Sequence, residues 1–176
     1  GEQRLVDRYA ALMLDLMLLR HAKSDWDSGA LDDHSRPLSN RGVRSAETMG
    51  TVLRDLGLVP DLVVSSTATR ARSTAELARL AGGWDSRLVL DDQLYGASVM
   101  DTLVVAERHG GDHQRLMLVG HEPTTSMVIR HFTGAAATVK TATCAAIELH
   151  TSQWDQVATC RGSLLALLQP RQFMHT

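Results

Sequence analysis

The sequence predicts an α/β fold: a three-layer αβα sandwich around a mostly parallel central sheet. Short, nearly continuous apolar runs alternate along the chain with longer segments whose apolar residues recur every three or four positions. The first pattern is typical of strands buried on both faces of a parallel sheet, and the second of amphipathic helices. With 176 residues, 44% of them hydrophobic, the chain has enough apolar material for one core. We expect a single domain over residues 1–176, with residues 1–13 as an N-terminal extension or cloning remnant.

The first expected strand is the apolar run Leu14–Leu19, which ends abruptly in a polar loop over Arg20–Pro37. Ser39 is a favourable N-cap for the helix that follows, and Gly57 and Pro60 stop that helix. Later strands are expected at Leu62–Ser65, about Leu88–Leu90, Leu116–Val119, Ala145–Leu149, Val157–Thr159 and Leu164–Leu168. Later helices are expected from Ala68 to Gly82, from about Ser98 to His109, and from Pro123 to Phe132.

Charge and hydropathy exclude several classes of function. The 18 Lys and Arg residues against 20 Asp and Glu leave a net charge of −2, far from the basic excess typical of duplex-binding proteins. No apolar run approaches the roughly 20 residues that span a bilayer, and the N-terminal residues lack the pattern of a signal peptide. The expectation is therefore a cytoplasmic protein with neither nucleic acid nor membrane as a partner.

Cationic side chains follow three of the predicted strands. Arg20 and His21 stand in the string RHAKS, Arg70 in SSTATRARSTAE, and His121 in VGHEP. Ligands of open α/β sheets bind beyond the carboxyl ends of the strands, so these side chains are expected to meet at one edge. Each alone is more often structural, but arginine forks match phosphate oxygens bidentately, and the joint occurrence indicates a phosphate site.

Other phosphate and metal chemistries fit the sequence less well. Neither cysteine is followed six residues later by the arginine that a cysteine phosphatase needs, and no P-loop or serine-hydrolase string is present. Asp25 and Asp27 form a D-x-D pair like that of phosphatases with an aspartyl-phosphate intermediate, but the residues around the pair make this match weak. His109 and His113 lie in a glycine-rich turn that lacks two further metal ligands. We expect no metal ion and no cofactor.

The three strings, together with RPLSNRG at Arg36–Gly42, resemble the histidine phosphatase superfamily, and within it the small SixA-like phosphohistidine phosphatases. The resemblance covers about Leu16 to the C-terminus. It implies a phosphoglycerate mutase-like fold and a hydrolase that acts on phosphoramidate or phosphoester bonds. Three motifs in this order make the resemblance specific, whereas an Arg-His pair alone would be weak.

The resemblance also implies roles for individual residues. His21 would attack phosphorus and become a phosphohistidine, which requires a neutral imidazole whose second nitrogen donates to a fixed acceptor. Arg20, Arg70 and His121 would hold the phosphoryl oxygens in place of a metal ion.

The general acid is not the glutamate that many larger members carry in an inserted segment, because this chain has no room for that insertion. By its position before the RPL string, Asp33 resembles an acidic residue of the SixA-like branch and is the first candidate. Ser24, Arg36 and Glu122 are further candidates for binding phosphate or substrate. Asp32, Asp27 and Glu122 follow Asp33 as possible acids.

Lack of a strong acid favours a leaving group that departs easily, such as the imidazole of phosphohistidine, over an alkoxide. The missing acid thus favours a phosphoramidate or an activated ester, and the SixA-like resemblance implies a phosphatase that acts on phosphohistidine in a protein. A small phosphorylated metabolite is the alternative substrate. A non-catalytic phosphate- or phosphopeptide-binding module is the alternative class, which the retained His21 disfavours.

Overall fold

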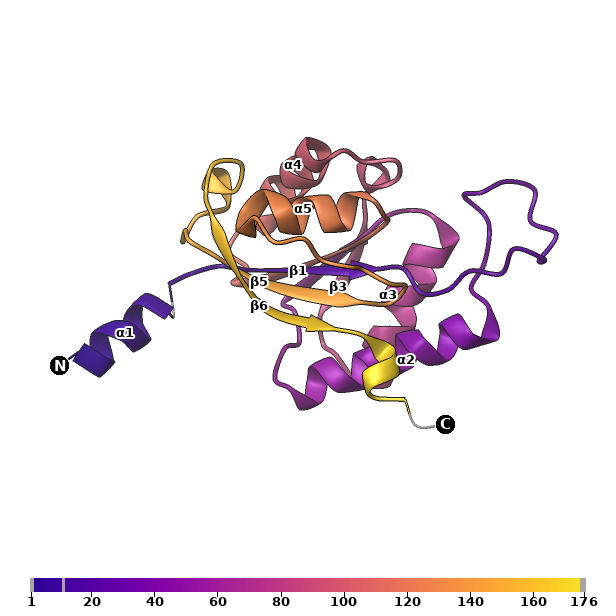
Figure 1. Cartoon of the computed structure of the whole chain (residues 1–176), viewed down its shortest axis with the longest axis horizontal. Helices are drawn as coiled ribbons and strands as arrows, with labels where there is room; N and C mark the ends of the chain where they lie inside the picture. The colour runs from indigo at the N-terminus through magenta and orange to yellow at the C-terminus, as the bar shows by residue number, and fades with distance from the viewer. Residues whose placement is uncertain (1, 11, 175–176) are drawn as a thin grey trace.

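The structure, a computed structural model that describes residues 2–10 and 12–174, has three layers (Figure 1). The strands are β1 (Asp15–Arg20), β2 (Leu62–Ser65), β3 (Arg87–Leu90), β4 (Arg115–Gly120), β5 (Cys144–Leu149) and β6 (Gly162–Leu168). The helices are α1 (Glu2–Ala10), α2 (Asn40–Asp55), α3 (Thr69–Gly82), α4 (Val99–Gly110) and α5 (Thr124–Thr133). Short 3₁₀ helices are η1 (Asp92–Leu94), η2 (Trp154–Gln156) and η3 (Pro170–Gln172). Helices α2 and α3 cover one face of the sheet and α4 and α5 the other, which confirms the predicted sandwich.

The sheet has the order β3-β2-β4-β1-β5-β6, and the first four of these strands run parallel. In the register, Arg20 pairs with Gly120 and Ser65 with Val119, so the carboxyl ends of β1, β2 and β4 lie at one edge. Strand β5 is antiparallel to β1, and β6 is antiparallel to β5. The segment 134–143 before β5 therefore reaches the same edge as the ends of the parallel strands.

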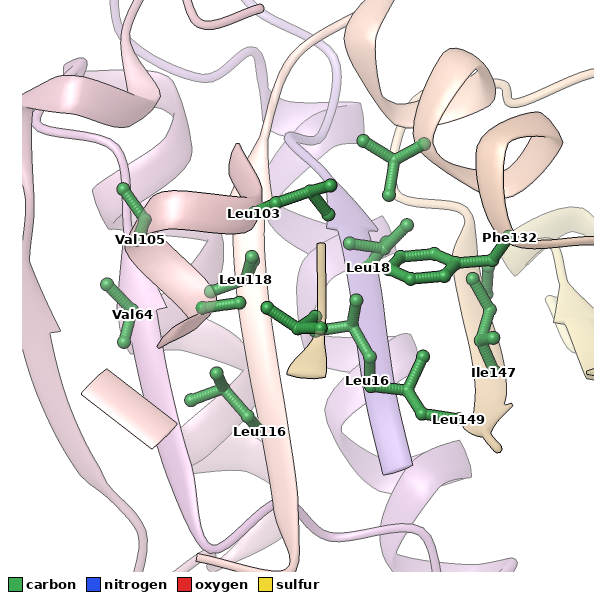
Figure 2. Close-up of a cluster of buried hydrophobic side chains, with 14 of the residues drawn as sticks. Leu16, Leu18, Val64, Leu103, Val105, Leu116, Leu118, Phe132, Ile147 and Leu149 are labelled. Carbon is green, nitrogen blue, oxygen red and sulfur yellow. The ribbon is translucent and has the colours of Figure 1, made fainter. Parts of the chain in front are cut away.

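Each face of the sheet has its own core, because successive side chains of a buried strand point to opposite faces. Leu16 and Leu18 of β1 pack with Phe132 of α5 on one side, in the cluster shown in Figure 2. Met17 and Leu19 pack against α2 and α3 on the other. Each fully buried apolar side chain of this size stabilises the fold by about 1.5–3 kcal/mol, so both layers are firmly attached to the strands that carry the site.

The loop after β1 is tied to the start of α2. Ser39 caps this helix as predicted, its side chain accepting a hydrogen bond from the Gly42 amide at 3.1 Å. A Cβ atom at Gly42 would collide with the backbone oxygen of Lys23. Glycine thus allows the helix to lie directly against the segment that follows His21.

Two sequence predictions need correction. Val157–Thr159 is not a strand: the chain forms η2 and a turn there, with the Trp154 indole donating to the His113 carbonyl at 2.8 Å and packing beside Gly110. Burial of this ring favours a tight turn over extension. Helix α1 also lies in the expected N-terminal extension, where no element was predicted. Among the described residues, no helix is both long and apolar enough to cross a membrane.

Candidate active site

The strand ends bring the sequence-predicted side chains to one edge of the sheet. The His21 amide donates to the Gly120 carbonyl at 3.0 Å, so the residues after β1 and β4 are adjacent. The ring centroids of His21 and His121 are 5.2 Å apart. A cavity of about 460 Å³, which we call the phosphate cavity, opens at this edge. Its lining residues are Arg20, His21, Lys23, Ser24, Trp26, Arg36, Arg70, Lys140 and Thr141.

His21 is buried and has a defined tautomer. Its Nδ1 lies 2.7 Å from the backbone oxygen of Ala22, and because a carbonyl only accepts, Nδ1 carries the proton. Nε2 therefore keeps its lone pair. Burial lowers the pKa of His21 to about 3, and the nearby charges of Arg70 and Arg20 act in the same direction. The imidazole is thus neutral and nucleophilic at physiological pH.

The positive charge of the site comes from three arginines: Arg36 and Arg70 are buried, and Arg20 is half-buried. Arg20 donates from Nη1 to the Val139 carbonyl at 2.8 Å, while Arg36 and Arg70 are 8% and 6% exposed. Burial lowers the pKa of Arg20, and Glu122 opposes this shift. In the described part of the chain, nothing accepts a hydrogen bond from the buried Nε of any of the three. Unsatisfied charged donors around a cavity favour an anion as ligand.

Asp33 lies against these arginines as an acceptor. Its carboxylate accepts from Arg36 Nη2 at 2.7 Å, Arg70 Nη2 at 3.0 Å and the Tyr95 hydroxyl at 2.8 Å. The hydrogen bonds from Arg36 and Tyr95, with the charge of Arg70, hold the pKa of Asp33 well below its ordinary value. The carboxylate is therefore ionised at neutral pH, and its role as proton donor stays a prediction.

The remaining predicted binding residues divide between two cavities. Ser24 accepts a hydrogen bond from Arg36, whose guanidinium lies 3.6 Å from the centroid of the exposed Trp26 ring, and all three line the phosphate cavity. Glu122 instead lines a neighbouring cavity of about 360 Å³. Its Oε1 accepts from the Ser126 amide at 2.7 Å, in the first turn of α5. Glu122 therefore serves that turn in this arrangement.

His121 also lines the neighbouring cavity, beside His21. Its Nε2 shares a hydrogen bond with the Ser66 hydroxyl at 2.8 Å, and its ring lies edge-on to Tyr95. Burial, followed by the charge of Arg70, lowers the pKa of His121 to about 4. It is neutral at physiological pH, so the positive charge of the site comes from the arginines.

The structure adds a positioning residue that the sequence analysis missed. Thr74 is fully buried; its hydroxyl accepts from the Ala22 amide at 2.9 Å and donates to the Arg70 carbonyl at 2.6 Å. It thereby joins the segment after β1 to the first turn of α3. The four-residue spacing between Arg70 and Thr74 places both on one helix face and is the signal that was available.

Lys140 and Thr141 also line the phosphate cavity and were missed. They precede β5, and the Ala142 amide donates to the carbonyls of Arg20 and His21, at 3.1 Å each. A prediction that β5 runs antiparallel would have placed this turn at the correct edge.

Residues 16–95 match the family profile described as "Histidine phosphatase superfamily (branch 1)", and an uncharacterized chloroplastic protein of Arabidopsis thaliana is 30% identical over 156 residues. That alignment covers 84% of this chain and 72% of the relative. The chain belongs to the histidine phosphatase superfamily. A solved structure assigned as phosphohistidine phosphatase SixA of Nakamurella multipartitia superposes with a TM-score of 0.78 at 29% identity, covering 90% of this chain and 96% of that one.

The same fold is found in the protein histidine phosphatase SixA in complex with tungstate, with a TM-score of 0.78 at 16% identity, covering 92% of this chain and the whole of that one. The proteins similar to this superfamily member include both phosphatases and mutases. The phosphoglycerate mutase-like fold predicted from the motifs is thereby confirmed.

The buried His21 and the half-buried His121 give the stability of this superfamily member a specific pH dependence. The folded pKa values of His21 and His121 are about 3 and about 4, against an ordinary 6.5. Between these values the unfolded chain binds more protons, so stability is full above about pH 6.5 and falls as the pH drops. Each histidine removes up to about 1.4 kcal/mol from the free energy of unfolding per pH unit.

Urea unfolding of the wild type and His21→Gln between pH 7 and pH 4 measures this effect. The variant should lose stability with a shallower slope than the wild type. Replacement of the exposed His150 by Gln is the matched control and should keep the wild-type slope. Equal slopes in the wild type and His21→Gln would contradict a neutral buried His21.

Proposed function

We propose that this chain is a metal-independent phosphatase that transfers a phosphoryl group first to His21 Nε2 and then to water. The observation that carries the proposal is one cavity lined by a neutral His21, whose Nε2 keeps its lone pair, and by three arginines with buried, unsatisfied Nε donors. In the first step the Nε2–P bond forms as the bond from phosphorus to the leaving group breaks. In the second, water attacks phosphorus, inorganic phosphate leaves, and the imidazole is regenerated.

The arginines would supply the electrostatic stabilisation of this reaction. Charge spreads over the three equatorial oxygens of the phosphoryl group in a loose transition state. Arg20, Arg36 and Arg70 line the cavity with fixed donors, and donors that are already in place need no reorganisation when charge develops. His121, beside His21, would contribute one further N–H.

Phosphohistidine on a protein is the substrate that we propose. Among the described residues that line the phosphate cavity, none is a carboxylic acid, and Asp33 is ionised. A leaving imidazole needs less help from a proton donor than an alkoxide does. The likeness to the structure assigned as SixA supports the same substrate class.

A parallel assay of phosphohistidine protein, sugar phosphates and nucleotides, with and without a chelator, tests this proposal. We expect the highest kcat/KM on phosphohistidine, no loss with the chelator, and inhibition by vanadate, which mimics five-coordinate phosphorus. Faster turnover of a sugar phosphate would favour a small-molecule phosphomonoesterase. Phosphate binding without turnover of any compound would indicate a binding module, and complete, metal-reversible loss on chelation would exclude the metal-independent mechanism.

Replacing Asp33 by Asn should slow alkyl phosphates about 100-fold while changing aryl phosphates and phosphohistidine much less, because a proton donor matters most for basic leaving groups. The measurement is kcat/KM across a leaving-group series. Asp85→Asn, at an exposed carboxylate that precedes β3 at the opposite edge of the sheet, is the control. A uniform loss on every substrate would instead make Asp33 a positioning residue for Arg36 and Arg70.

A further inference from the structure

A third and smaller cavity, of about 180 Å³, adjoins the phosphate cavity on another side. The two share Lys23, Lys140 and Thr141 as lining residues. The rest of the smaller cavity comes from the start of α2 and from the segment around η3. We call it the basic groove, because four of its lining side chains are cations: Lys23, Arg41, Lys140 and Arg171.

Positive charge is concentrated around the two cavities. Together they are lined by seven of the chain's 18 Lys and Arg residues, although the net charge of the chain is −2. No Asp or Glu is among the described residues that line either cavity. Two of these seven cations, Arg36 and Arg70, pair with Asp33 beside the phosphate cavity. Over residues 2–10 and 12–174, the groove cations form no such ion pair. Such a patch attracts anions.

The placement of individual cations has no structural explanation. Lys23 and Lys140 are the only lysines in the 176 residues, and both lie on the wall that the two cavities share. Arg41 stands in the first turn of α2, where the helix dipole favours a negative side chain, and that turn contains no acidic residue. These positions therefore indicate a ligand.

Hydrogen bonds fix the basic groove relative to His21. The Lys23 carbonyl accepts from the Ser39 amide at 2.9 Å and from its hydroxyl at 3.1 Å, which holds Lys23 against the start of α2. The turn that carries Lys140 is held by the Ala142 amide, bonded to the carbonyls of Arg20 and His21. An anion in the groove would therefore lie at a defined distance from the phosphoryl group on His21.

We propose that the basic groove binds a second anionic group, a carboxylate or phosphate, carried by the leaving group of the substrate. The inference rests on the proposed function, which places the transferred phosphoryl group in the phosphate cavity. An acidic side chain near a phosphohistidine and an acidic substituent on a small phosphorylated molecule present the same chemistry to the groove. The substrate thus carries two anionic groups: the phosphoryl group that is transferred and a second group on the leaving portion.

Calorimetry with phosphonates tests the proposal without any need for turnover, because their P–C bond is not hydrolysed. The ligands form a series of linker lengths, each ending in a carboxylate or in the matched carboxamide. We expect at least one carboxylate ligand to bind about fivefold tighter than its matched carboxamide. The ratio of the two affinities should be smaller at high salt. A double replacement of Arg41 and Arg171 by Ala should remove this preference.

Arg87→Ala is the matched control, because this exposed arginine begins β3 at the opposite edge of the sheet; it should keep the preference. Lack of a preference at every linker length, or its survival in the double variant, would overturn the proposal. Phosphonate binding without hydrolysis of any phosphorylated compound would count against the proposed function alone.

Two turnover assays identify the source of the second anion. One compares phosphohistidine peptides flanked by Glu or by Gln, and the other compares aryl phosphates that carry a carboxylate or a carboxamide. A higher kcat/KM for the acidic member in either pair, reduced in the Arg41/Arg171 double variant, supports the basic groove and names the substrate class. Equal values within both pairs would contradict it.

Discussion

Replacing His21 with alanine should lower kcat by about ten thousandfold or more on every substrate, by analogy with the loss of other enzymatic nucleophiles. The change removes the Nε2 lone pair that we expect to attack phosphorus, while the arginines stay in place. Stopped and continuous phosphate-release assays measure the loss. His150→Ala, at an exposed histidine beyond the far end of β5, should keep wild-type turnover.

Retained phosphate binding by His21→Ala, measured by calorimetry, would show that this variant is folded with its anion site intact. Near-normal turnover in the same variant would contradict the assignment of His21 as nucleophile.

Replacing Arg70 with alanine should lower kcat/KM by about 100-fold to 1,000-fold, the loss typical of one oxyanion donor. The effect should be similar for alkyl, aryl and phosphohistidine substrates, because the guanidinium stabilises the phosphoryl group whatever departs. Arg72→Ala is the control, since Arg72 lies two residues later and pairs with Glu76 at the surface. A loss confined to substrates with basic leaving groups would assign Arg70 to the leaving group instead.

Arg70→Lys separates charge from geometry. Lysine keeps the positive charge but cannot donate from two nitrogens at once, so its activity should fall between those of the wild type and Arg70→Ala. Full activity in the lysine variant would mean that the bidentate geometry of Arg70 is unimportant.

The convergence of Arg20, His21, Arg70 and His121 was predictable from the sequence because parallel strands share the direction of their carboxyl ends. Each of these residues follows a short apolar run, which predicts a buried strand. The structure bears out that sheet geometry through the pairing of β1 with β4 and of β2 with β4. Their catalytic roles still rest on the proposed function.

Other parts of the site were beyond sequence reasoning for physical reasons. The antiparallel direction of β5 brings Lys140 to the edge of the sheet where His21 lies, and the short apolar run of β5 does not reveal in which direction that strand runs. Asp33 was predicted from its position in the chain, but its ionised state depends on contacts with Arg36 and Tyr95 across the loop. The false strand at Val157–Thr159 arose because a short apolar run does not reveal that Trp154 buries its ring.

Trapping the covalent intermediate is the most direct test of the mechanism. Wild-type protein is mixed briefly with a substrate carrying a labelled phosphoryl group, denatured in base and mapped by peptide mass spectrometry. The mechanism predicts label on His21 that is stable in base and released in acid. Turnover with no label on His21, or with base-labile label on an aspartate such as Asp25 or Asp27, would contradict it.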